Sequence, residues 1–177
     1  MSDSLEQAHL LSDTTREAIG REVGRYPDSR SCLIPALRRA QQERGWLSKD
    51  VLDEVAHLVG EDSNALASLA TFYDMFYMQP VGRFVISCCS GFACYLNGGD
   101  DLIDYLSTRL EIPVGGTTND GLFTLQPMEC LAGCGIAPMI LVDGDYHGNL
   151  TRDAVDAILR DLRTKAATDP NPVFFER

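Results

Sequence analysis

Two pairs of cysteines place the strongest constraint on how this chain can fold. The first pair is Cys89 and Cys94 in the segment CSGFAC, and the second is Cys130 and Cys134 in CLAGC. Each pair follows a predicted strand, so loops at the same end of neighbouring strands can bring all four thiolates together. Four thiolates, two on each iron, are what a [2Fe–2S] cluster requires.

The spacing of these cysteines is equally compatible with a structural zinc site, because C-x2–4-C pairs are common around zinc. A thiol–disulfide enzyme is less favoured, since the chain has no C-x-x-C motif. Glycines beside the cysteines, Gly91, Gly133 and Gly135, let backbone N–H groups approach the sulfurs closely. The cysteines alone therefore predict a metal site without deciding the metal.

Cys88 creates a second candidate for the first ligand, because Cys88 or Cys89 could pair with Cys94. Neighbouring residues of a strand point to opposite faces of the sheet, so only one of them can be a ligand. The x4 spacing favours Cys89 and leaves Cys88 as a small buried residue. Cys32 lies among helical apolar residues and is predicted to belong to the core.

Composition limits the classes of function open to the chain. Its 177 residues suffice for two small cores without disulfides, and its net charge of −11 opposes binding to nucleic acid. The longest apolar stretch, residues 136–142, is too short to span a membrane, and the first residues lack the pattern of a targeting signal. We therefore expect a cytoplasmic protein, in which clustered cysteines are metal ligands rather than disulfides.

The first part of the chain, residues 1–80, is predicted to be a helical bundle that binds a partner. Apolar residues recur at helical spacing, with Gly45 and Gly60 at the expected helix ends. Ser48 and Ser63 are predicted to cap two of the helices. The expected helices cover residues 13–25, 30–44, 49–59 and 64–73.

The second part, residues 81–177, changes to short β-branched and aromatic runs separated by glycine-rich turns. Thr151 is predicted to cap the last helix, and the tail from about residue 164 is expected to be loosely attached. A βα crossover followed by a hairpin and a packing helix suggests an α/β (α+β) fold with a small mixed sheet. The expected elements are strands at 83–88, 122–125, 139–142 and 146–149 and a helix at 100–110.

Several longer segments carry a resemblance to a known family. They are IPALRRAQQERGWL (34–47), TFYDMF (71–76), QPVGR (79–83), CYLNG (94–98), GTTNDGLFTL (116–125), ECLAGCG (129–135) and NLT (149–151). Together they resemble the thioredoxin-like [2Fe–2S] subunit, of the 24 kDa type, of the NADH dehydrogenase module of respiratory complex I. Cys88 departs from that family's usual pattern.

The resemblance implies a thioredoxin-like second domain with one [2Fe–2S] cluster on Cys89, Cys94, Cys130 and Cys134. It implies a one-electron carrier of an NADH:quinone oxidoreductase without a catalytic site of its own. FMN and NADH would be held by the neighbouring subunit, which the helical domain would grip, and other peripheral-arm subunits would also be partners. The expected location is the cytoplasmic face of a bacterial inner membrane, without insertion into it. Similar carriers serve NAD-dependent formate dehydrogenases and bidirectional hydrogenases, and a zinc-stapled module is the alternative from another class.

Overall fold

The computed structural model describes residues 9–168, which form two compact units divided between Pro80 and Val81. We call them the helical unit and the sheet unit. The helical unit contains α1 (Asp13–Val23), the 3-10 turn η1 (Ser29–Cys32), α2 (Leu33–Arg44), α3 (Lys49–Val59) and α4 (Ser63–Phe72). The sheet unit contains β1 (Phe84–Cys89), α5 (Phe92–Leu96), α6 (Gly99–Leu110), β2 (Phe123–Met128), η2 (Cys134–Ile136), β3 (Ile140–Val142), β4 (Asp145–His147) and α7 (Arg152–Thr168).

The ends of the helices in the first unit follow the capping residues of the sequence. Ser48 accepts a hydrogen bond from the Val51 N–H at 3.2 Å, as predicted, and α2 and α3 end at left-handed Gly45 and Gly60. The prediction that Ser63 caps the next helix was wrong. Asp62 is the cap, because its carboxylate accepts from the N–H groups of residues 64 and 65.

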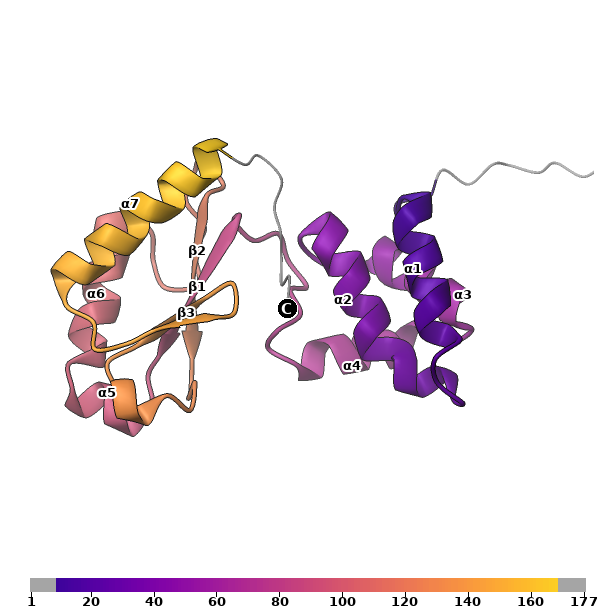
Figure 1. Cartoon of the computed structure of the whole chain (residues 1–177), viewed down its shortest axis with the longest axis horizontal. Helices are drawn as coiled ribbons and strands as arrows, with labels where there is room; N and C mark the ends of the chain where they lie inside the picture. Colours follow the sequence, from indigo (N-terminus) through magenta and orange to yellow (C-terminus); the bar gives the residue numbers. More distant parts are fainter. Residues whose placement is uncertain (1–8, 169–177) are drawn as a thin grey trace, which may run out of the picture. The chain divides into compact units, whose positions relative to one another are not determined.

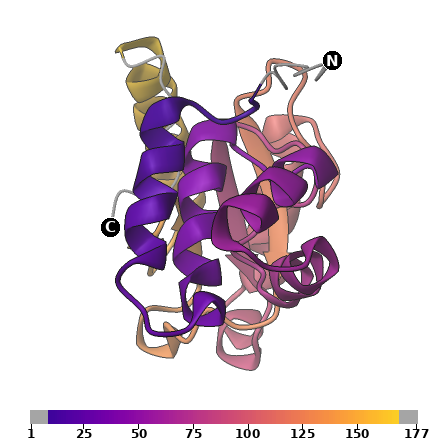
Figure 2. The same ribbon diagram turned by 90° about the vertical axis from the view of Figure 1, so that its right-hand side faces the viewer.

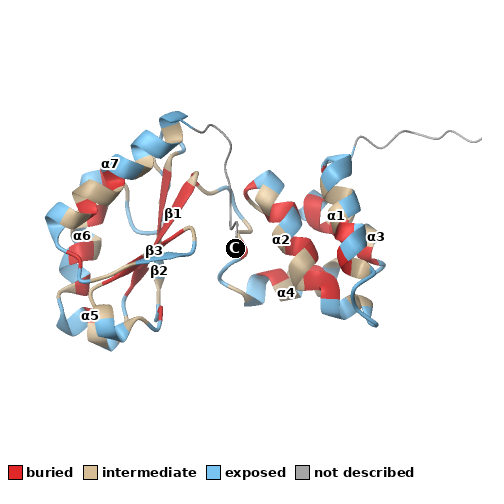
Figure 3. Ribbon diagram, in the orientation of Figure 1, coloured by how far each residue is buried: buried red, intermediate tan, exposed pale blue. Residues whose placement is uncertain are grey.

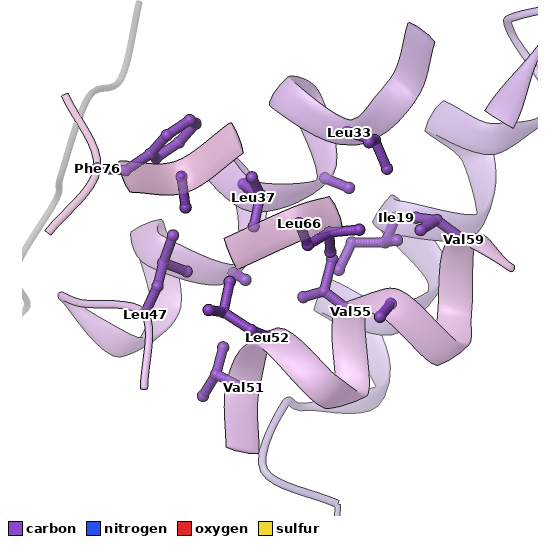
Figure 4. Close-up of a cluster of buried hydrophobic side chains, with 14 of the residues drawn as sticks. Ile19, Leu33, Leu37, Leu47, Val51, Leu52, Val55, Val59, Leu66 and Phe76 are labelled. Carbon is purple, nitrogen blue, oxygen red and sulfur yellow. The ribbon is translucent and has the colours of Figure 1, made fainter. Parts of the chain in front are cut away.

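The core of the helical unit draws side chains from all four helices. Figure 4 shows Ile19, Leu37, Val55 and Leu66 converging, one from each of α1 to α4. Helices α1 and α2 lie side by side in both views (Figures 1 and 2). Cys32 is buried in this core, as predicted, and its thiol donates to the Ser29 carbonyl at 2.9 Å. This cysteine is therefore a packing residue.

The sheet unit has the predicted small mixed sheet, with strand order β2-β1-β3-β4. Strand β1 is parallel to β2 and antiparallel to β3, and β3 and β4 form the expected hairpin. Helices α6 and α7 cover the same face of the sheet (Figure 1), where they pack on Phe84, Ile86 and Cys88 of β1. Figure 3 shows the buried sides of α6 and α7 turned toward the sheet.

The last helix extends further than the sequence indicated. Thr151 accepts from the Ala154 N–H at 3.3 Å and caps α7, as predicted. The helix then continues past residue 164, where we expected a loose tail, and reaches Thr168. Arg83 holds this end by donating to the Ala166 carbonyl at 3.0 Å. The rest of the predicted tail, residues 169–177, lies outside the described residues.

Within residues 9–168, no helix combines the length and the apolar character that crossing a membrane would require.

Candidate metal centre

The pairing of β1 with β2 places the two cysteine loops at one edge of the sheet. Cys89, the last residue of β1, lies opposite Met128, the last residue of β2, and the two strands are parallel. The loops that follow are joined directly, because Ser90 donates to the Met128 carbonyl through both its N–H (2.9 Å) and its hydroxyl (3.1 Å). The chain therefore brings the distant cysteine pairs together, as their positions after two strands suggested.

The first pair is buried. Cys89 ends β1, and Cys94 lies on the short helix α5, which the sequence analysis did not predict. Gly99, the first residue of α6, allows this helix to approach closely, since a Cβ at Gly99 would lie 2.8 Å from the Cys94 backbone. A glycine is thus required where α6 passes behind the second ligand candidate.

The sulfur of Cys89 is the centre of a small hydrogen-bond network. Burial alone would raise the pKa of Cys89, but N–H groups of Leu131 and Gly91 and thiols of Cys94 and Cys130 donate to its sulfur and lower that pKa below its ordinary value. Burial and the neighbouring Cys89 raise the pKa of Cys94 to about 11, although the Met139 N–H donates to its sulfur. Three candidate ligands from both loops therefore lie within hydrogen-bonding contact.

The second pair, Cys130 and Cys134, is exposed. The Ala132 N–H donates to the Cys130 sulfur at 3.4 Å, and Ala132 adopts the left-handed conformation with φ 59°. The Tyr146 hydroxyl of β4 donates to the Leu131 carbonyl at 3.1 Å and ties this loop to the hairpin. The second loop is thus exposed, with its backbone held by the Ala132 and Tyr146 contacts and its Cys130 sulfur in contact with Cys89.

Gly91 lies between the two loops. A Cβ there would be 3.0 Å from the Glu129 carbonyl oxygen and 3.5 Å from the Cys89 sulfur. It would also be 3.6 Å from Cys130 Cβ, so a side chain would fill the space between the first and second loops. A glycine at this position preserves the room that a group bound by both pairs needs, and it donates its N–H to Cys89.

Cys88 and Cys89 occupy different environments. Cys88 packs with Ile86, Leu106 and other residues beneath α6 and α7, whereas Cys89 packs with Cys94, Leu131 and Met139. Burial, followed by the neighbouring Cys89, raises the pKa of Cys88 to about 12, as expected for a thiol in an apolar core. These observations support Cys89 over Cys88 as the first ligand.

The donor set fits an iron–sulfur cluster. Cys89 contacts Cys94 of its own loop and Cys130 of the other loop, and a [2Fe–2S] cluster takes four thiolates, two on each iron. The backbone N–H groups that donate to Cys89, Cys94 and Cys130 stabilise negative charge on sulfur.

Comparison with known proteins also indicates an iron–sulfur protein. The family profile of the thioredoxin-like [2Fe–2S] ferredoxins matches residues 19–163. The chain is 45% identical over 150 residues to a subunit of the NADH-quinone oxidoreductase of Rhizobium meliloti, covering 85% of this chain and 89% of that protein. It is 38% identical over 153 residues to a subunit of the NADH-quinone oxidoreductase of Escherichia coli K12, covering 86% and 92%.

Among solved structures, the chain resembles an NAD+-reducing [NiFe]-hydrogenase in the air-oxidised state, with a TM-score of 0.67 and 23% identity. The match covers 81% of this chain and 25% of the hydrogenase chain, so it concerns the fold alone.

Proposed function

Because the chain belongs to the thioredoxin-like [2Fe–2S] ferredoxin family, we propose that it is a one-electron carrier subunit of an NADH:quinone oxidoreductase. Relatives named as subunits of that enzyme are 36–45% identical and match over 85–92% of their own lengths. Agreement over nearly the whole relative, rather than over the cysteine loops alone, is the observation that carries this proposal.

We assign Cys89, Cys94, Cys130 and Cys134 as the ligands of one [2Fe–2S] cluster, on the geometry of the two loops. When bound, the cluster accepts and returns one electron. The chain holds it at the edge of the sheet and directs backbone N–H groups at the sulfurs, which favours the more negative, reduced state. No residue of this chain needs to transfer a proton or bind a substrate.

The exposure of the second pair gives the electron a route to another subunit. Cys130 and Cys134 are exposed, whereas Cys89 and Cys94 are buried. We propose the flavin- and NADH-binding subunit as the neighbour. The helical unit offers a surface for gripping it, because Phe72 is 77% exposed and Met75 is 43% exposed, while Phe76 of the same segment belongs to the core.

The same proposal places the chain in the peripheral arm of the complex, on the cytoplasmic face of the bacterial inner membrane. There it would contact further peripheral-arm subunits. We do not propose nucleic acid as a partner, because the net charge of −11 repels phosphate groups, which bind to clustered basic side chains.

A second candidate host is an NAD-dependent formate dehydrogenase or a bidirectional hydrogenase that uses a similar carrier. The likeness to the NAD+-reducing [NiFe]-hydrogenase shows that the fold is compatible with either host. The electron-transfer role of this chain would be unchanged, since the substrate chemistry would belong to other subunits.

Affinity purification of the tagged chain from its native cells, followed by identification of the co-purifying proteins, tests the host. We expect a flavin-binding subunit together with membrane-embedded, quinone-reducing subunits. A molybdenum- or nickel-containing subunit in their place would replace the complex I host with the second one. Co-purification without any flavin-binding subunit would contradict both.

A further inference from the structure

Met139 contacts both cysteine loops, the first through its backbone and the second through its side chain. It precedes β3, follows a cis Ala137–Pro138 peptide bond and is 1% exposed. We propose that Met139 is a positioning residue that sets the spacing between the two loops and so the geometry of the cluster site. This inference rests on the proposed function.

The backbone of Met139 holds the first loop at both of its cysteines. Its carbonyl accepts from the Cys89 N–H at 3.4 Å. Its own N–H donates to the Cys94 sulfur. The two peptide units that flank the Met139 Cα thereby hold the end of β1 and the middle of α5.

The side chain of Met139 fixes the second loop. Its sulfur occupies the position that a Cβ on Gly133 would take, and its terminal methyl lies 3.0 Å from that position. Gly133 is therefore a glycine because Met139 fills the space beside it.

Methionine suits this place because its unbranched, flexible side chain can fill an irregular gap between two loops. Met139 packs with Cys89, Cys94 and Leu131, with Ile136 partly buried against the same group. Changing its length should alter the separation of the loops, and hence the electronic structure and reduction potential of what they hold.

The alternative is that Met139 only contributes to stability, as any core residue does. Ile140 provides a matched control, because it is also 1% exposed but packs with the residues beneath α6 and α7. Truncation of either residue removes a buried apolar side chain of similar size. Only truncation of Met139 should affect the cysteine loops.

The test uses the anaerobically purified full chain as wild type, Met139→Ala, Met139→Leu and Ile140→Ala. We would measure iron per chain, the EPR spectrum after reduction, the midpoint potential and the thermal unfolding midpoint. We expect both alanine variants to unfold at lower temperature. Met139→Ala should also lose iron and shift the EPR spectrum and the midpoint potential. Met139→Leu should keep most of the iron and a spectrum and potential close to those of wild type. Ile140→Ala should match wild type in iron content, EPR spectrum and potential.

Gly133→Ala and the double variant Gly133→Ala/Met139→Ala test the contact from its other side. Gly133→Ala should shift the same spectrum and lower iron occupancy, because its Cβ collides with the methionine. Removing the methionine side chain makes room for that Cβ, so the double variant should recover occupancy relative to Gly133→Ala. If Met139→Ala does not fold, Gly133→Ala, which keeps the methionine, decides the question.

The inference is overturned if Met139→Ala matches Ile140→Ala in EPR spectrum and potential, or if Gly133→Ala leaves both unchanged. It is also overturned if the double variant recovers nothing. A wild-type chain that shows no cluster signal contradicts the proposed function itself, and that outcome is recognised before any variant is compared.

Discussion

Strand β1 contributes residues to two different environments, the apolar core beneath α6 and α7 and the cluster of cysteines at the end of the strand. Phe84, Ile86 and Cys88 face the helices α6 and α7 and form the core of the sheet unit. Cys89, one residue further, faces Cys94, Leu131 and Met139. In this small sheet, the apolar contacts that stabilise the fold lie on the face covered by α6 and α7. The cysteine loops lie at the end of β1 and β2 instead.

The sharpest way to test this separation is to exchange the sulfur for oxygen at each of the adjacent cysteines. Cys89→Ser should lose or severely damage the cluster, because it removes the sulfur that contacts both Cys94 and Cys130. Cys88→Ser should keep the cluster, since its side chain packs beneath the helices. Visible absorbance and iron per chain in the purified variants measure the effect.

Thermal unfolding provides the control for this pair, because Cys88→Ser places a hydroxyl in an apolar core and should lower the stability of the fold. Full visible absorbance in Cys89→Ser, or its loss in a folded Cys88→Ser, would reverse the assignment of the ligand.

Leu106→Ala tests the opposite side of the comparison. Leu106 of α6 is fully buried against the sheet core, so the truncation should cost about 3 kcal/mol in free energy of unfolding. The EPR spectrum of the folded variant should be that of wild type. Urea unfolding gives the cost, and an altered spectrum would show that the helical face and the cysteine edge are not separate.

Asp143 lies after β3, at the end of the sheet opposite the cysteine loops, and its ionisation should affect the stability of the fold. Burial raises its pKa to about 6, although the Val85 N–H and the charges of Lys165 and Arg83 oppose that shift. The folded state therefore binds this proton more tightly than the unfolded state. Its contribution to stability is full below the ordinary pKa of 3.8 and is lost as the pH rises through 6.

We expect Asp143 to lower the free energy of unfolding by about 1.4 kcal/mol between pH 5 and roughly pH 7.5. Asp143→Asn should remove this part of the pH dependence, measured by urea unfolding at the two pH values. Asp104→Asn, at an exposed position of α6, is the control. An identical pH dependence in wild type and Asp143→Asn would refute the linkage.

The smallest effect is expected at Ala132, where the second loop takes a left-handed conformation. Glycine removes the steric cost of that conformation but loses more backbone entropy on folding, so Ala132→Gly should stabilise by less than about 1 kcal/mol. Ala132→Val should instead lower stability and iron occupancy. A destabilised Ala132→Gly with a wild-type Ala132→Val would show that the loop is not held in this conformation.

The sequence predicted the fold class and most elements, because helical and strand periodicities are local properties. Ser48 and Thr151 were recognised as caps on the same basis. At the start of α4, Asp62 and Ser63 are both good caps in adjacent positions, and only the structure shows that Asp62 accepts the N–H groups. The brief helix α5 escaped prediction because one turn gives no periodicity.

The proximity of the two cysteine loops could be predicted, since each pair follows a strand and those strands are neighbours, whereas the assignment of the four ligands stays a prediction. The role of Met139 could not be predicted, because it depends on contacts with Cys89, Cys94 and Gly133 that are formed only in the folded chain. A single methionine before a short apolar run carries no local signal of such contacts.

Quantifying iron and unpaired electrons in the anaerobically purified wild-type chain tests whether the chain holds one [2Fe–2S] cluster. We predict two irons per chain, visible absorbance in the oxidised protein, and an EPR signal that appears on reduction and accounts for one unpaired electron per chain. A colourless protein that holds stoichiometric zinc, gains no iron on reconstitution and gives no EPR signal on reduction would contradict this prediction.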